Sequence, residues 1–197
     1  MNSEVLDVDM LAFERGSSNT KQAVVDGVMK SLETGFVYTS HDMSQDFLDE
    51  VYGMLGEFFS KSTPQKETAK AEGTNGQRGY TGLLVETAAI SDVPDWKEML
   101  NWGKDIPTGH PLKKRYPHRF FNNVFPEDLV PGITGTLEKF HDQVLDLQLR
   151  FLRIIASGLK ASETFFDSFV PGGATLTRAI NYPAMNLAPD DNHLWAE

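Results

Sequence analysis

The stretch ITGTLEKFHDQVLDLQLRFLRIIAS, residues 133–157, decides the fold. Its apolar residues recur at intervals of three and four, which is the spacing of one face of an α-helix. Gly158 follows directly, and glycine is typical of the position just past a helix end. We therefore predict one long helix over 133–157.

Downstream of this helix, the run TLTRAINY at 175–182 alternates, is rich in β-formers and is closed by Pro183. These features predict a strand. Arg178 and Tyr182 lie four residues apart on it, so their side chains share one face. A cation and a phenol on one face make either a polar outer face or the lining of a cavity, and the residues support the two interpretations equally.

Upstream of the helix, the pattern alternates between short strands and helices. A strand is predicted at 8–11, followed by a helix through 24–32 that Gly35 ends. A strand at 36–38 and a Phe-rich helix at 44–60 come next. Thr63-Pro64 then begins another helix, because proline is tolerated at the first helical position.

Two segments lack periodicity and are predicted as loops: EGTNGQRGYTG at 72–82 and the proline-rich segment 92–125. Arg78, in the first, is either a surface charge or a clamp for an anionic substrate group, and the residues alone favour the surface. The second carries a basic cluster with aromatic neighbours at 113–121. We interpret it as a solvated loop, with single-strand nucleic-acid binding as the weaker alternative.

Composition and charge exclude several classes of protein and site. The chain has 197 residues, 18 Lys+Arg against 28 Asp+Glu, a net charge of −10 and no cysteine. These values exclude a disulfide framework, a thiolate zinc site and a cysteine nucleophile in this chain, and they disfavour a nucleic-acid partner. The acidic start and the lack of an apolar run of roughly 18 residues predict a cytoplasmic protein without a membrane span. The sequence indicates no oligomeric state.

The histidines show no metal-binding spacing. None of the five is followed two residues later by Asp or Glu, and no His-Glu-x-x-His occurs. We interpret them as surface or hydrogen-bonded residues, and we predict no metal ligand and no catalytic residue within this chain.

In its order of segments, the chain resembles the N-terminal two-thirds of the isopenicillin N synthase-like family of non-haem iron, 2-oxoglutarate-dependent oxygenases. The resemblance rests on seven segments in a shared order. They are the strand near 8–11, GFVY at 35–38, EFF at 57–59 before Thr63-Pro64, RGYTG at 78–82, DWKEMLNWG at 95–103, IIASGL at 154–159 and LTRAINYP at 176–183.

This resemblance implies an α+β fold with a double-stranded β-helix, or jelly-roll, core and flanking N-terminal helices. Residues 1–125 would form the N-terminal helical and strand region, and 126–197 the long supporting helix with the first core strands. The implied activity uses Fe(II), 2-oxoglutarate and O2 to hydroxylate, desaturate or cyclise a small molecule.

The resemblance assigns few residues. It implies that Tyr182 and Arg178 bind the co-substrate, and that Arg78 and Tyr80 contact the substrate. The His-x-Asp iron motif is expected where HLWAE, residues 193–197, ends the chain, and His193 itself is a poor ligand because Trp195 stands where an Asp is required.

A second interpretation comes from a different class of protein. The chain could be a non-catalytic helical fragment or interaction module, or one half of a split enzyme. A half β-helix would leave strand edges open, which invites pairing with another chain. A His-x-Asp followed by a later His in the gene would favour the oxygenase.

Overall fold

The computed structural model describes residues 5–87 and 93–184. Contacts divide the chain into two units, and each unit combines segments that are distant in sequence. Residues 1–45 and 142–173 form the first unit, and residues 46–141 and 174–197 form the second. The predicted division at residue 125 stays a prediction.

The first unit holds two short parallel strands and the N-terminal helices. Its elements are β1 (Leu6–Val8), α1 (Met10–Arg15), α2 (Ser18–Ser31), β2 (Val37–Thr39) and η1 (Phe165–Ser168). The strand predicted at 8–11 is wrong beyond Val8, because the Asp9 carboxylate accepts from the N–H of Ala12 and begins α1. Gly35 takes a φ of +77° after α2, which confirms the expected helix end.

One long helix, α6 (Ile133–Gly158), contributes to both units and confirms the helix predicted at 133–157. In the first unit its Ile154 is fully buried against Val28 and the side chains around it. Arg150 on the same helix forms ion pairs with Glu14 and Asp42, at 2.5 and 2.8 Å. These contacts join the N-terminal segment to α6 inside one unit.

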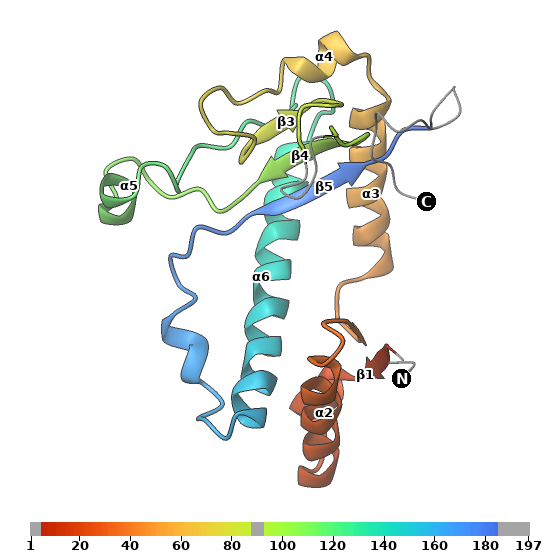
Figure 1. The fold of residues 1–197 in the computed structure, drawn as a ribbon, viewed down its shortest axis with the longest axis vertical. Coiled ribbons are helices and arrows are strands. Elements are labelled where there is room, and N and C mark those ends of the chain that lie inside the picture. Colours follow the sequence, from red (N-terminus) through yellow and green to blue (C-terminus); the bar gives the residue numbers. More distant parts are fainter. Residues whose placement is uncertain (1–4, 88–92, 185–197) are drawn as a thin grey trace. The chain divides into compact units, whose positions relative to one another are not determined.

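The second unit is built on a three-stranded antiparallel sheet in the order β3-β4-β5 (Figure 1). Its strands are β3 (Gly79–Thr81), β4 (Glu98–Trp102) and β5 (Thr177–Asn181), and its helices are α3 (Gln45–Ser60), α4 (Thr63–Glu67) and α5 (Pro111–Arg115). The predicted helix at 44–60 and the predicted strand at 175–182 are confirmed. The core contains Phe58, Leu100, Trp102, Ile133 and Leu137.

Both segments predicted as loops contain a strand. β3 lies inside 72–82, and β4 lies inside 92–125 as the central strand of the sheet. All five residues of β4 are buried, so the strand shows no polar and apolar alternation. A strand covered on both faces gives no period-two signal, and this is why the sequence did not indicate it.

None of the described helices is both long and apolar enough to cross a membrane.

Candidate functional site

The sheet of the second unit has two chemically different faces. Strand register places Tyr80, Leu100 and Ala179 side by side across the three strands. Because these residues pack into the core with α3 and α6, this is the helix-facing side. The opposite face carries Asn101 paired with Arg178 and Met99 paired with Ile180, and we call it the polar side after its arginine and amide.

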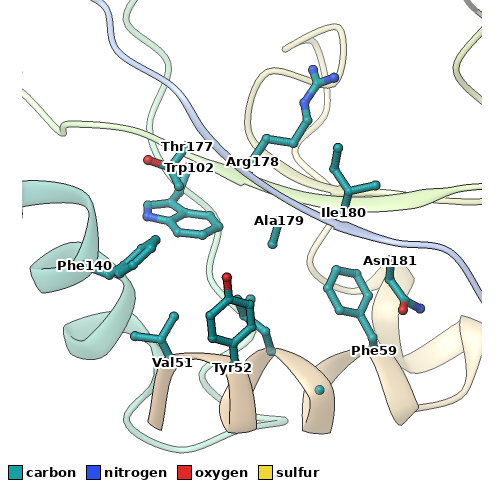
Figure 2. A pocket seen from close by; sticks show the side chains of 12 residues that line it. Val51, Tyr52, Phe59, Trp102, Phe140, Thr177, Arg178, Ala179, Ile180 and Asn181 are labelled. Carbon is teal, nitrogen blue, oxygen red and sulfur yellow. The ribbon is translucent and has the colours of Figure 1, made fainter. Parts of the chain in front are cut away.

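A pocket of about 520 Å³ lies on the helix-facing side, between α3 and β5 (Figure 2). Tyr52 and Phe59 of α3, Trp102 of β4 and Phe140 of α6 supply its aromatic lining. In Figure 2 the Arg178 side chain extends away from these rings. The pocket therefore offers aromatic and aliphatic surface but not the guanidinium of Arg178.

On the polar side, Arg178 belongs to a chain of paired charges. Its Nε donates to Oδ1 of Asn101 at 3.1 Å, and its Nη1 pairs with Oε1 of Glu86 at 3.3 Å. Lys97 pairs with Glu86 and Asp95, at 2.8 and 2.5 Å. Burial opposes protonation of Lys97, but the bonds to Asp95 and Glu86 outweigh it and raise the pKa of the amine. Arg178 is thus held in a fixed orientation with a third of its side chain exposed.

Tyr182 is the first residue after β5 and is about half exposed. The register of the sheet ends at Asn181, so it does not place the Tyr182 side chain on either face. The shared face of Arg178 and Tyr182 therefore stays a prediction from the two-residue period of a strand.

The interpretation of Arg78 as a surface charge is wrong, since only 2% of the residue is exposed. Its Nη1 donates to the carbonyl of Gln77 at 2.7 Å and its Nη2 to that of Thr175 at 3.4 Å, while Nε has no partner among the described residues. Burial lowers the pKa of the guanidinium, and the charge of Asp105 opposes this shift. A Cβ on Gly103 would lie 2.2 Å from the carbonyl oxygen of Thr175 and 2.5 Å from Nη2 of Arg78, and the clash with the backbone oxygen makes glycine necessary there.

Tyr80 lies on the helix-facing side, where it is 3% exposed. Its hydroxyl donates to Oε2 of Glu98 at 2.5 Å. Burial and then this hydrogen bond raise the pKa of the phenol above its usual range. The structure thus separates Tyr80 from Arg178, which lies on the other face.

The structure contains a buried cluster around Glu98 that the sequence did not predict. Lys66 donates to both carboxylate oxygens of Glu98, at 2.9 and 2.7 Å, and Asn181 donates to Oε1 at 2.9 Å. Together with Tyr80, these residues form what we call the Glu98 cluster. The sequence carries no signal for this cluster, because Lys66 and Asn181 are 32 and 83 residues away from Glu98.

Of the histidines within 5–87 and 93–184, His141 is the one that is buried. Both ring nitrogens of His141 are hydrogen-bonded, Nδ1 with the Thr177 hydroxyl at 2.6 Å and Nε2 with the Thr175 hydroxyl at 3.0 Å. This fits the expectation of a hydrogen-bonded histidine. His193 and the expected start of the iron motif lie outside the described residues.

Solved structures define the class of the fold. The chain superimposes on a putative 2OG-Fe(II) oxygenase family protein from Caulobacter crescentus with a TM-score of 0.78 and 25% identity, covering 93% of this chain and 58% of that one. It matches a full-length Neurospora crassa protein, solved in complex with alpha-KG, with a TM-score of 0.75 and 26% identity, covering 93% and 56%. These matches confirm the predicted α+β oxygenase fold.

The family follows from the sequence match. Residues 5–128 match the model described as non-haem dioxygenase in morphine synthesis N-terminal, and the chain belongs to this family. A probable iron/ascorbate oxidoreductase from Dictyostelium discoideum is 25% identical over 98% of this chain and 55% of its own length. A 2-oxoglutarate-dependent dioxygenase from Aspergillus niger is 26% identical over 91% and 56%. The chain thus spans little more than half the length of these relatives.

Proposed function

We propose that the chain is part of an Fe(II)- and 2-oxoglutarate-dependent oxygenase that uses O2 to hydroxylate, desaturate or cyclise a small molecule. The observation that carries this proposal is the match over 93% of the chain to a structure solved with alpha-KG. Iron and 2-oxoglutarate would supply the oxidising chemistry when bound. A cytoplasmic location and the lack of a nucleic-acid partner belong to the same proposal and rest on composition.

The described residues do not fit an iron centre. Within 5–87 and 93–184, no group of three or more His, Asp or Glu side chains is placed to hold a metal ion. A facial iron site needs two histidines and a carboxylate around open positions. Under this proposal the iron ligands lie outside these ranges, and the described part supplies the scaffold and groups that bind carboxylates.

Arg178 and Tyr182 are the proposed co-substrate residues. The bonds of Arg178 through Nε and Nη1 fix the plane of its guanidinium, and a fixed fork of N–H groups suits a carboxylate. Lys97 offsets the negative charge of the neighbouring Glu86, so this acid repels an incoming carboxylate less. The Tyr182 hydroxyl would add a second donor from the same side of the strand.

Arg78 and Tyr80 are the proposed substrate residues. The two hydrogen bonds of Arg78 go to uncharged carbonyls, so no bonded carboxylate neutralises its guanidinium, which would attract an anionic group of the substrate. Tyr80 would act through its position beside Glu98, since its hydroxyl already donates to that carboxylate.

Arg178→Lys in the full gene product tests the co-substrate role. We expect about five- to tenfold weaker 2-oxoglutarate binding, because an ammonium cannot present the planar fork of N–H groups with which a guanidinium binds a carboxylate. Isothermal titration calorimetry with Mn(II) in place of iron measures the Kd without turnover. Arg153→Lys is the matched control, because Arg153 binds Asp167 through two guanidinium nitrogens in the other unit. An unchanged Kd for Arg178→Lys would contradict the assignment.

A non-catalytic fragment, or one half of a split enzyme, remains the second candidate. The lack of an iron ligand set within 5–87 and 93–184 favours it. The two candidates differ in one measurable property, which is iron-dependent turnover of 2-oxoglutarate by the full gene product without another polypeptide.

A further inference from the structure

Tyr182 lies just past the end of β5, where its pairing with β4 stops. The β4-β5 ladder ends at the pair Glu98↔Asn181, and Pro183 has no N–H with which to extend it. The backbone at Tyr182 is therefore fixed by contacts other than the ladder.

Two side-chain hydrogen bonds flank this tyrosine. On one side, Asn181 donates to Oε1 of Glu98 at 2.9 Å. On the other, Nε1 of Trp96 donates to the carbonyl of Pro183 at 2.8 Å. Trp96 and Glu98 are two residues apart, so one short segment holds the chain on both sides of Tyr182.

The Glu98 side of this contact is reinforced by further hydrogen bonds. The Glu98 carboxylate is 2% exposed and accepts hydrogen bonds from Lys66 and Tyr80 as well as from Asn181. An ionised acceptor makes the bond from Asn181 stronger than one between neutral groups. In Figure 2 Asn181 lies on the strand beside Phe59, where β5 leaves the pocket.

We propose that Trp96 and Glu98 are positioning residues, which hold the backbone on both sides of Tyr182 so that its phenol is preorganised to bind the 2-oxoglutarate carboxylate. The proposal rests on the co-substrate role proposed for Tyr182. A half-exposed side chain loses conformational entropy when a ligand fixes it, and it loses more if the backbone beside it is also mobile. Because the backbone on both sides of Tyr182 is already held, the entropy lost on binding is smaller and binding is tighter.

A double-mutant cycle in the full gene product tests the proposal, with 2-oxoglutarate affinity measured by calorimetry in the presence of Mn(II). Tyr182→Phe removes the phenol hydroxyl, and we expect about tenfold weaker binding. Trp96→Phe removes the bond to Pro183 but keeps an aromatic ring, and we expect about three- to tenfold weaker binding. Because Trp96 acts through Tyr182, the double variant should bind no more weakly than Tyr182→Phe alone.

Thr34→Val is the control. The Thr34 hydroxyl also donates to backbone carbonyls, those of Ser31 and Phe36 at 3.0 and 3.1 Å, but in the first unit. Both variants should lower the melting temperature, and only Trp96→Phe should change the affinity for 2-oxoglutarate. This difference separates positioning from general stabilisation.

Two results would overturn the proposal, and they are distinguishable. In the first, Tyr182→Phe weakens binding but Trp96→Phe does not, or the two effects multiply in the double variant. Trp96 then does not act through Tyr182, while the co-substrate role of Tyr182 stands. If Tyr182→Phe leaves the affinity unchanged, the co-substrate role itself fails, and the positioning role fails with it.

Discussion

Single residues differ in whether their placement depends on neighbouring or on distant parts of the chain. The strand that carries Arg178 was predictable, because strand periodicity is local. The burial of Arg78 was not, since it depends on Gly103 and Thr175, which are 25 and 97 positions further along the chain. The Glu98 cluster was hidden for the same reason: its members come from four separate elements.

At this scale, the Glu98 cluster makes a prediction about stability. Lys66→Met removes the cation that offsets a carboxylate only 2% exposed. We expect a loss of about 3–5 kcal/mol in the free energy of unfolding, because an uncompensated charge stays buried. Urea titration measures this value, and Lys66→Met/Glu98→Gln should recover part of it.

Lys61→Met provides the matched control for this variant. Lys61 pairs with Glu57 at 2.8 Å, one helical turn away, and the Glu57 side chain is 53% exposed. An exposed pair of this kind contributes about 0.3–0.5 kcal/mol. Equal losses for the two lysine variants would show that burial of the Glu98 cluster does not stabilise the fold.

The longer helices were predictable from the sequence, whereas α1, α5 and two of the strands were not. A period near 3.6 revealed α2, α3 and α6, because each helix buries one face. β3 was obscured by the surrounding glycines, and β4 by burial on both faces. The boundary between β1 and α1 was set by the Asp9 cap, a local contact that apolar spacing does not register.

The start of α6 carries a pH-dependent cap. The Glu127 carboxylate accepts from the hydroxyl and N–H of Thr134, at 2.5 and 3.0 Å, and from the N–H of Gly132 at 2.6 Å. The Thr134 hydroxyl, followed by these backbone groups, lowers the pKa of Glu127. The resulting stability is present above the pKa of the unfolded chain and is lost as pH falls through the lower pKa of the folded state.

Glu127→Gln should therefore lower the urea midpoint near neutral pH, and the gap from the unchanged protein should narrow as the pH falls below the pKa of the unfolded chain and through the lower pKa of the folded state. Glu138→Gln, at an exposed acid one turn into α6, is the control and should show no such convergence. A gap that stays constant with pH would contradict an ionised cap.

At the scale of the whole molecule, the chain holds one part of an oxygenase architecture. The match covers 93% of this chain but 56–58% of the solved oxygenase-fold structures. Within the described residues, β5 pairs with β4 along one edge and with no strand along the other. The sequence predicted the class of fold because the order of its segments resembles the family, whereas the two-unit arrangement depends on long-range contacts.

The most direct test of this account is anaerobic titration of the 197-residue chain with Fe(II) in the presence of 2-oxoglutarate, followed by its visible charge-transfer absorption. Because the described residues hold no iron ligand set, we predict no band for this chain. We predict a band for the protein once a segment with His-x-Asp and a later His is included. A band from the 197-residue chain alone, or none from the longer protein, would contradict the account.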